Sequence, residues 1–338
     1  MQSFLEEVVD RVREAHPSLE NVVIILPSKR AGTFVRNALA KTTQKTEFAP
    51  EIHSIESFIE QISGITYATN TEQLFELYTT YERITKGEKD NFYAFSKWGQ
   101  TLLQDFNEID RYLIDVQQLF ANLSAIQEIG VWAPNAPRTQ MMEDYVSFWN
   151  NIETLYTNFN TCLLEKSIGH QGLVYRQAHQ HINIYLEGCS HKTHVFIGFN
   201  ALNTAEEKII QRFLKNPQTK IYWDIDQYFL DDPIHDAGLF IRQHAKTWDF
   251  FKKNALDGSS NSYTTEKKIE IVGVPKNVSQ AKYVGYLLNR IQEEEKEDSL
   301  RKTAVVLGDE TLLNPILNSV PETISEVNIT MGYPLHKT

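Results

Sequence analysis

Runs of consecutive apolar residues alternate with amphipathic segments near both ends of the chain. The clearest run is 21–27 (NVVIILP), which is typical of a strand in a parallel sheet covered on both faces. A polar loop over 28–32 follows this run, and a helical pattern begins at Thr33. Shorter apolar runs predict strands over 50–53, 194–199 and 220–225. Each of these is followed by an amphipathic segment, the last over 238–253, so the pattern predicts parallel strands joined by helices.

The middle of the chain, 71–187, has a different period. Apolar residues recur there in steps of three and four, as in helices that pack along one seam. The longest such run extends from Met142 to Leu163, and another helix is predicted over 173–186. No strand is predicted in this stretch, so we expect an all-helical insertion.

A polar segment of small residues, 257–265 (DGSSNSYTT), is the best boundary in the sequence. After it, the pattern predicts strands over 268–274, 303–308 and 328–331 and helices over 278–294 and 311–319. We interpret this part as the beginning of a second α/β domain. The last residues, MGYPLHKT, contain no closing element, so we expect the polypeptide to continue past Thr338.

Composition and charge limit the classes of protein to consider. The 338 residues include 41% hydrophobic residues, enough for real cores, and carry a net charge of −11. That charge argues against a uniformly basic surface for nucleic acid or membranes, although a local basic groove is compatible with it. The two cysteines, the acidic N-terminal segment and the lack of a long apolar run predict a cytoplasmic protein without a membrane partner.

The segment after the first predicted strand, PSKRAGT, stands where a phosphate-binding loop would stand. Such a loop needs several glycines, a lysine at the helix start and a Ser/Thr for Mg²⁺. Here one glycine, Gly32, precedes Thr33, and there is no GK[ST] sequence. Ser28, Lys29 and Arg30 could still hold a phosphate near the helix N-terminus, or they could belong to an ordinary basic loop.

The strand over 194–199 ends where a nucleotide-hydrolysing enzyme places an acidic pair for Mg²⁺. This chain has Gly198, Phe199 and Asn200 at that point. The next carboxylates, at positions 206 and 207, are expected to serve the N-terminus of a helix capped by Thr204. Both halves of an NTP-hydrolysing pair are therefore missing, and we expect neither ATP nor Mg²⁺ as a cofactor.

Three further groups of residues have a structural and a functional interpretation. An acidic cluster could hold a metal or could cap the next helix, and aromatic residues of the helical block could stack on bases or form its core. We favour the structural interpretation for both, and also for four histidines that lack a second ligand at a useful spacing. The acidic cluster contains Asp224, Asp226, Asp231, Asp232, His235 and Asp236; the aromatic residues are Tyr78, Tyr81, Phe92, Phe95, Trp98 and Trp149; the histidines are His16, His53, His170 and His194.

Four segments together resemble the N-terminal helicase-like part of AddB-type subunits of bacterial AddAB/RecBCD-like helicase–nucleases. The first, ILPSKRAGTFVRNAL, occupies the position of the Walker A motif, and the second, APEIHSIESFIEQI, follows the second predicted strand. The third, HVFIGFNALNTAEEKII, resembles a degenerate Walker B segment. The fourth is AVVLGDETLLNPILNSVPE together with the closing signature VNITMGYPL. The helical block is also similar in style, notably LLQDFNEIDRYLID. More narrowly, the chain resembles proteins of the PD-(D/E)XK nuclease family whose superfamily I helicase region is inactivated.

The resemblance implies a RecA-like, P-loop NTPase-like α/β fold with an all-helical insertion and the start of a second RecA-like domain. Domain 1A would comprise 1–66 and 191–256, the 1B-like insertion 67–190, the linker 257–267 and the incomplete 2A-like domain 268–338. In such proteins the nuclease domain lies far toward the C-terminus, so this chain would carry no nuclease residue and no catalytic residue.

We therefore expect a catalytically inactive helicase-like module that binds or scaffolds DNA in the repair of double-strand breaks by an exonuclease. Its partners would be DNA, single-stranded or as duplex ends, and a motor subunit of the AddA type. The candidate phosphate contacts are Ser28, Lys29, Arg30, Gly32 and Thr33. Two alternatives remain: an active ATPase with an atypical phosphate loop, and an assembly scaffold that makes no DNA contact.

Overall fold

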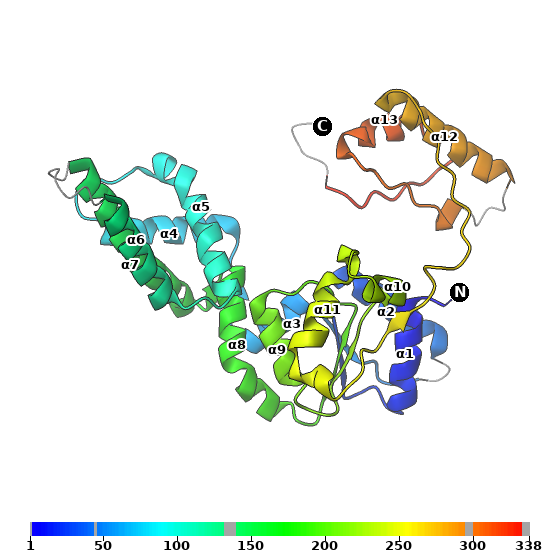
Figure 1. Ribbon diagram of the computed structural model, residues 1–338, viewed down its shortest axis with the longest axis horizontal. Coiled ribbons are helices and arrows are strands. Elements are labelled where there is room, and N and C mark those ends of the chain that lie inside the picture. The colour runs from blue at the N-terminus through cyan, green and yellow to red at the C-terminus, as the bar shows by residue number, and fades with distance from the viewer. Residues whose placement is uncertain (1, 44–45, 132–139, 295–299, 333–338) are drawn as a thin grey trace. The chain divides into compact units, whose positions relative to one another are not determined.

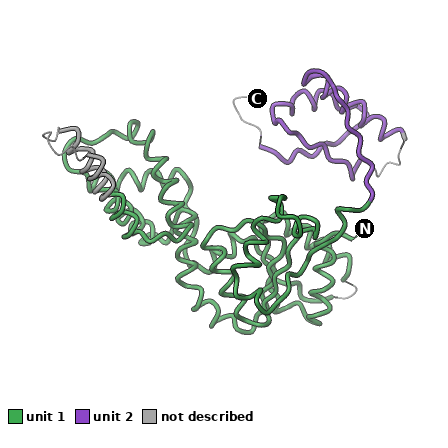
Figure 2. Tube along the Cα trace, viewed as in Figure 1, with its two compact units in different colours: residues 1–265 green, residues 266–338 purple. Residues whose placement is uncertain are grey.

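The computed structural model describes residues 2–43, 46–131, 140–294 and 300–332. It forms a mixed α/β structure with two compact units, residues 1–265 and 266–338 (Figure 2). Helices dominate both units, and the first contains a small parallel sheet (Figure 1).

Four parallel strands form the sheet of the first unit, in the order β2-β1-β5-β6. Their bounds are β1 Val22–Leu26, β2 Glu51–Ser54, β5 Thr193–Ile197 and β6 Lys220–Tyr222. In the register, Ile24 lies beside Ile52 of β2 and Val195 of β5, which places β1 in the interior of the sheet. Because both faces of β1 are covered, all five of its side chains are buried, as a continuous apolar run predicts.

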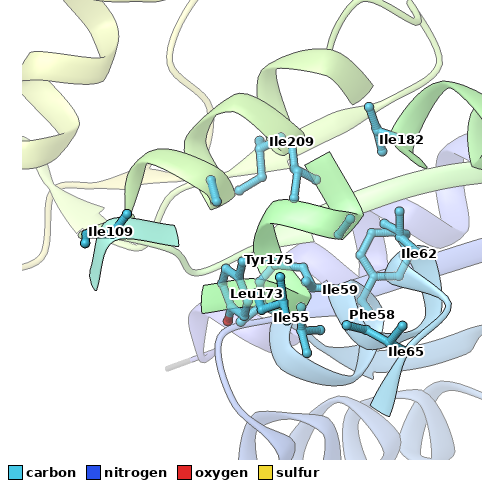
Figure 3. Packing of buried hydrophobic residues seen from close by; sticks show 14 of the residues in the cluster. Ile55, Phe58, Ile59, Ile62, Ile65, Ile109, Leu173, Tyr175, Ile182 and Ile209 are labelled. Carbon is cyan, nitrogen blue, oxygen red and sulfur yellow. The ribbon is translucent and has the colours of Figure 1, made fainter. Parts of the chain in front are cut away.

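Helices cover the two faces of this sheet. On one face, α1 (Phe4–Ala15) and α2 (Lys29–Thr42) pack on Val22, Ile24 and Leu26. On the other, α3 (Ile55–Ser63), α8 (Gln171–Gly188) and α9 (Thr204–Phe213) contribute to a second core with Val23 and Ile25. Figure 3 shows this second core, with Phe58 and Ile59 of α3 near Tyr175 of α8. The strands predicted over 21–27, 50–53, 194–199 and 220–225 are thus formed, as are the helices that follow the first three of them and the helix over 173–186, with boundaries that differ by a few residues.

Between α3 and α8 the described residues form a block of four helices: α4 Asn70–Ile84, α5 Phe92–Arg111, α6 Val116–Val131 and α7 Gln140–Glu165. The block is not wholly helical, because β3 (Thr66–Tyr67) pairs with β4 (Ile168–Gly169). Helix α8 contacts α5 as well as α3 and α9, so it joins this block to the sheet. A Cβ on Gly172 would lie 2.1 Å from the carbonyl oxygen of Asn107, so α8 can begin this close to α5 only with glycine at that position.

The last part of the first unit consists of shorter helices and strands than the sequence pattern predicts. Trp248 interrupts the expected helix over 238–253, and Asp226 and the expected linker form a short parallel pair. The elements are β7 Ile225–Asp226, α10 Gln227–Asp231, the 3₁₀ turns η1 Asp236–Gly238 and η2 Asp249–Lys252, α11 Leu239–Thr247 and β8 Ser259–Ser260.

The second unit contains α12 (Asn277–Glu294), α13 (Leu313–Leu317) and the 3₁₀ turns η3 (Leu300–Lys302) and η4 (Glu310–Leu312). The three strands predicted here, over 268–274, 303–308 and 328–331, are not formed. Those segments have no ladder partner among the described residues, and without one an apolar run is not a strand. The fold here is therefore α12 packed on α13 rather than the expected beginning of a sheet.

Candidate functional site at the strand ends

Helix α2 begins immediately after the first strand. The predicted loop over 28–32 is wrong, because only Pro27 and Ser28 separate β1 from α2. The Ser28 hydroxyl accepts a hydrogen bond from the Ala31 N–H at 3.3 Å and thereby caps the helix. Lys29 and Arg30 occupy the first helical turn, and both are exposed. An N-cap serine that can start a helix at once is the signal that the sequence interpretation missed.

The other two candidate phosphate contacts, Gly32 and Thr33, also lie within helix α2 and not in a loop. Gly32 is buried inside the helix, and a Cβ there would lie 3.4 Å from a methyl carbon of Ile52 on β2. Thr33 is exposed on the next position of the helix. The backbone in this region is therefore helical where a phosphate-binding loop would have to be open.

The end of β5 is closed by neighbouring side chains. Gly198 has a φ of 74°, which favours glycine, and its N–H donates to the carbonyl of Tyr222 on the next strand. The ring of Phe4 would lie 3.7 Å from a Cβ at this position. Phe199 is buried with its ring 6.1 Å from that of Phe196, so it belongs to the core.

Asn200 is exposed, and its carbonyl lies 3.3 Å from Nε2 of the buried His244. Of the three degenerate Walker B positions, one is therefore a backbone turn, one a core residue and one a surface residue. None of them supplies a carboxylate.

The two candidate segments are close in space because β1 and β5 are parallel neighbours. Ser28–Arg30 and Gly198–Asn200 therefore follow strand ends at the same edge of the sheet. Along the chain, β2 is added on one side of β1 and β5 on the other, so the order of strands reverses here. Ligands of open α/β sheets bind at such a reversal, outside the carboxyl ends of the strands.

The charges at this edge favour an anion at α2. Of the helices that cover the sheet, α1, α3 and α9 have acidic residues in their first turns, whereas α2 and α8 have none, and α2 has two cations instead. A cation at the positive end of a helix dipole is unfavourable by about 0.3–1 kcal/mol. Within the described residues, neither Lys29 nor Arg30 forms an ion pair, so both side chains are available to an anionic ligand.

Glu206 is the first carboxylate in the sequence after β5; it is half-buried and already has partners. It forms a capping box with Asn203, which is the N-cap of α9 in place of the predicted Thr204. Its Oε1 also accepts a hydrogen bond from the Tyr175 hydroxyl at 3.2 Å. Burial raises the pKa of Glu206, and the hydrogen bonds of Asn203 and Tyr175 oppose that shift. This confirms the assignment of the carboxylate to the helix N-terminus.

The acidic residues after β6 have structural roles, and Asp226 in particular holds neighbouring backbone segments together. Asp226 accepts hydrogen bonds from the backbone N–H groups of Tyr228, Ser262 and Tyr263 and from the Ser260 hydroxyl. Asp232 lies 3.8 Å from His235. No group of three or more potential metal ligands occurs in the described ranges of the chain.

The aromatic residues of the helical block form its core, as predicted. Phe95 is fully buried, and its ring centroid lies 4.6 Å from that of Trp98 and 5.0 Å from that of Tyr81. Tyr78 packs against both Phe92 and Phe95. The side chain of Trp149 lies outside the described residues.

Three of the four histidines are placed in the interior or at its margin. His170 is buried and caps α8 by accepting a hydrogen bond from the Leu173 N–H at 3.2 Å. His194 is buried in β5, and His53 lies beside Glu51 at 3.7 Å. His16 ends α1 as its C-cap.

Sequence reasoning missed a buried polar cluster around Asp110 in the helical block. The carboxylate is fully buried and accepts hydrogen bonds from Arg176 Nε at 2.5 Å, from Asn160 Nδ2 at 3.1 Å and from the Tyr156 hydroxyl. These residues come from α5, α7 and α8, so the cluster fixes three helices together. The available signal was that Asp110 directly follows Ile109 on the apolar stripe of its helix.

Neither family models nor curated proteins match the chain. No described helix is both long and apolar enough to cross a membrane. Both cysteines, Cys162 and Cys189, are free thiols.

Proposed function

We propose that this chain is a helicase-like module without ATPase activity, which holds DNA for a helicase–nuclease that processes double-strand breaks. The sheet domain would be RecA-like, and a motor subunit of the AddA type would supply ATP hydrolysis. The proposal takes its direction from the four segments that resemble AddB-type subunits. One structural observation carries it: in the described residues, the ends of β1 and β5 present two cations without an ion pair and a capped helix, and the residues that directly follow these two strands include no carboxylate that could hold Mg²⁺.

The start of α2 suits a DNA phosphate. The side chains of Lys29 and Arg30 are exposed there, and the first turn of a helix has backbone N–H groups without partners in the helix. A phosphate oxygen would accept from these groups and offset the unfavourable position of the two cations. Contacts of this kind position a protein on DNA without reading its sequence.

The same geometry argues against a bound nucleotide. A phosphate-binding loop wraps its ligand with several consecutive N–H groups, and two residues between β1 and α2 are too few for that. The buried Gly32 has its place against β2 rather than at a ligand. After β5, the first carboxylate, Glu206, is engaged in a capping box.

A double variant, Lys29→Ala/Arg30→Ala, tests the DNA contact. Its matched control is Lys215→Ala/Lys220→Ala, which removes two exposed cations near the start of β6, at the opposite edge of the sheet. Fluorescence anisotropy with a single-stranded oligonucleotide and with a duplex end measures the Kd between 50 and 200 mM salt. We expect weaker binding for the first variant alone, by about tenfold at low salt, and a log Kd–log salt slope reduced by about 1 to 2. Equal binding by the two variants would contradict the proposal.

The two alternatives give different results with the same proteins. Micromolar binding of Mg-ATP in equilibrium dialysis, abolished by Lys29→Ala, would identify an ATPase with an unusual phosphate site. A wild-type chain that binds no DNA but copurifies with the motor subunit would be an assembly scaffold.

A further inference from the structure

A cavity of about 670 Å³, open to solvent on one side, lies between the first turn of α1, the second half of α2 and Asp224, the second residue after β6. Phe4 and Leu5 of α1 and Phe34 and Ala38 of α2 form its apolar wall. Ligand-binding cavities commonly have volumes of about 300–1,000 Å³, so this one can hold more than a single side chain.

Phe34 is the most exposed part of this wall. Its side chain is 53% exposed, whereas its neighbour Val35 is buried at 0% on the side of α2 that faces the sheet. A large apolar side chain in such a position is not needed by the core. It gives the rim of the cavity a surface that an apolar ligand group can cover.

The charges that line the cavity leave one negative charge without a counterion. Glu6 and Lys41 form an ion pair at 2.8 Å, so their charges offset one another. Asp224, which follows β6, forms no ion pair with any residue that the structure describes. Asp224 is exposed, but partial desolvation by its surroundings raises its pKa, which is the direction that a nearby cation would reverse.

We propose that this cavity binds a segment of a partner protein that presents an arginine or lysine beside a large apolar side chain. The apolar part of the segment would cover Phe34 and Ala38, and its cation would pair with Asp224. The sign of the unpaired charge disfavours a phosphate or nucleic-acid ligand at this place. The inference goes beyond the proposed DNA contact at Lys29 and does not rest on it.

Two small peptides test the chemistry of the cavity on the whole chain. The probe is acetyl-Phe-Arg-Leu-amide, and its partner is the same peptide with citrulline, a neutral residue of nearly the same shape as arginine. Titration calorimetry, supported by saturation-transfer NMR, measures the Kd of each. We expect the arginine peptide to bind about fivefold more tightly than the citrulline peptide, as one partly exposed charge pair provides.

Variants assign this preference to the cavity. Asp224→Asn is expected to abolish the preference for arginine, and Phe34→Ala to weaken both peptides while leaving the preference intact. Glu187→Gln, which removes an exposed acid on α8, is the control that changes neither.

The proposal is overturned if the wild type binds neither peptide at millimolar concentration, or if Asp224→Asn still prefers arginine. Because Lys29→Ala/Arg30→Ala should bind the peptides like the wild type, failure of this inference and failure of the DNA contact are distinguishable.

Discussion

Two parts of the molecule contain the same kind of apolar run and use it in opposite ways. In β1, no side chain from Val22 to Leu26 is more than 2% exposed. In the second unit, Ile271 is 93% exposed and Val306 88% exposed, although both lie in runs that predict buried strands.

The two runs differ in whether neighbouring strands and helices are present to pair with the backbone and cover the side chains. Ile24 has a strand on each side and helices on both faces of the sheet, so its backbone is paired and its side chain is covered. In the described part of the second unit, residues 268–274 have no strand beside them. A run of β-branched residues therefore indicates that a segment is suited to a sheet, while the sheet itself is made by the neighbours.

Truncation of one isoleucine in each part is the strongest test of this comparison. We expect Ile24→Ala to lower the free energy of unfolding by about 2–5 kcal/mol, because it leaves a cavity in a closely packed core. Ile271→Ala should change it by less than about 0.5 kcal/mol, because its side chain is already in water. Urea unfolding followed by circular dichroism measures both.

The two isoleucine variants also show what would break the comparison. A loss of more than 2 kcal/mol for Ile271→Ala would mean that this side chain is covered in solution. Val306→Ala is the matched second case, since it is exposed to a similar extent in another of the unpaired segments.

The same comparison explains how much of the fold could be predicted. The sheet strands and the long helices were predictable because their apolar periods are long and each is satisfied locally or by an adjacent element. The start of α2 was not, because the choice between a loop and a helix depended on one serine hydroxyl and the Ala31 N–H. The missing strands of the second unit were not predictable, because pairing is a property of segments far apart in sequence.

The sequence likewise predicted the position of the candidate site but not the buried polar cluster. Its location at the ends of β1 and β5 followed from the strand pattern, since parallel neighbours end at one edge. The Asp110 cluster could not be found by spacing, because its partners lie 46 to 66 residues further along the chain, on other helices. A charged residue beside the apolar stripe of a helix indicates that it needs a polar partner, but it does not indicate which residue that partner is.

Burial in the sheet should also make the stability of the first unit depend on pH through His194. Its ring is 2% exposed and lies against Phe213 and Phe58. Burial, with a contribution from Lys192, lowers its pKa to about 4, while Glu51 opposes the shift. An unfolded chain binds a proton on this histidine below pH about 6.5, and the folded chain does so only near pH 4.

Stability is therefore lost as the pH falls from about 6.5 to 4, by about 2–3 kcal/mol for this residue. Urea unfolding at pH 7.5 and 4.5 should show a smaller decrease for His194→Phe than for the wild type. His191→Gln, which removes an exposed histidine three residues earlier, should leave the decrease unchanged. Equal decreases in all three proteins would show that His194 is protonated as easily in the fold as in water.

The smallest expected effect concerns Asp226, where the paired part of the chain ends. Its Oδ2 accepts hydrogen bonds from the N–H groups of Ser262 at 2.8 Å and Tyr263 at 2.9 Å and from the Ser260 hydroxyl at 3.0 Å. The short β7–β8 pair beside it gives residues 259–260 a strand partner, which the apolar segments that follow do not have among the described residues. A polar segment is thus ordered by one carboxylate, while apolar segments a few residues later stay unpaired.

Asp226→Asn keeps the size of the side chain and presents a weaker acceptor, so the amides of Ser262 and Tyr263 should exchange hydrogen faster while those of β1 do not change. Burial would raise the pKa of Asp226, but the hydrogen bonds to its carboxylate lower it below its usual value. Its contribution is then complete above the unfolded-state pKa of about 3.9 and is lost as the pH falls through the lower native value. Hydrogen exchange by mass spectrometry on peptides that cover 258–265 measures this, with Asp249→Asn, an acid paired with Lys252 at the surface, as the control. If Asp226→Asn left those amides as protected as in the wild type, the ladder of β7 and β8 would order the segment by itself, and backbone pairing alone would separate the two parts of the molecule.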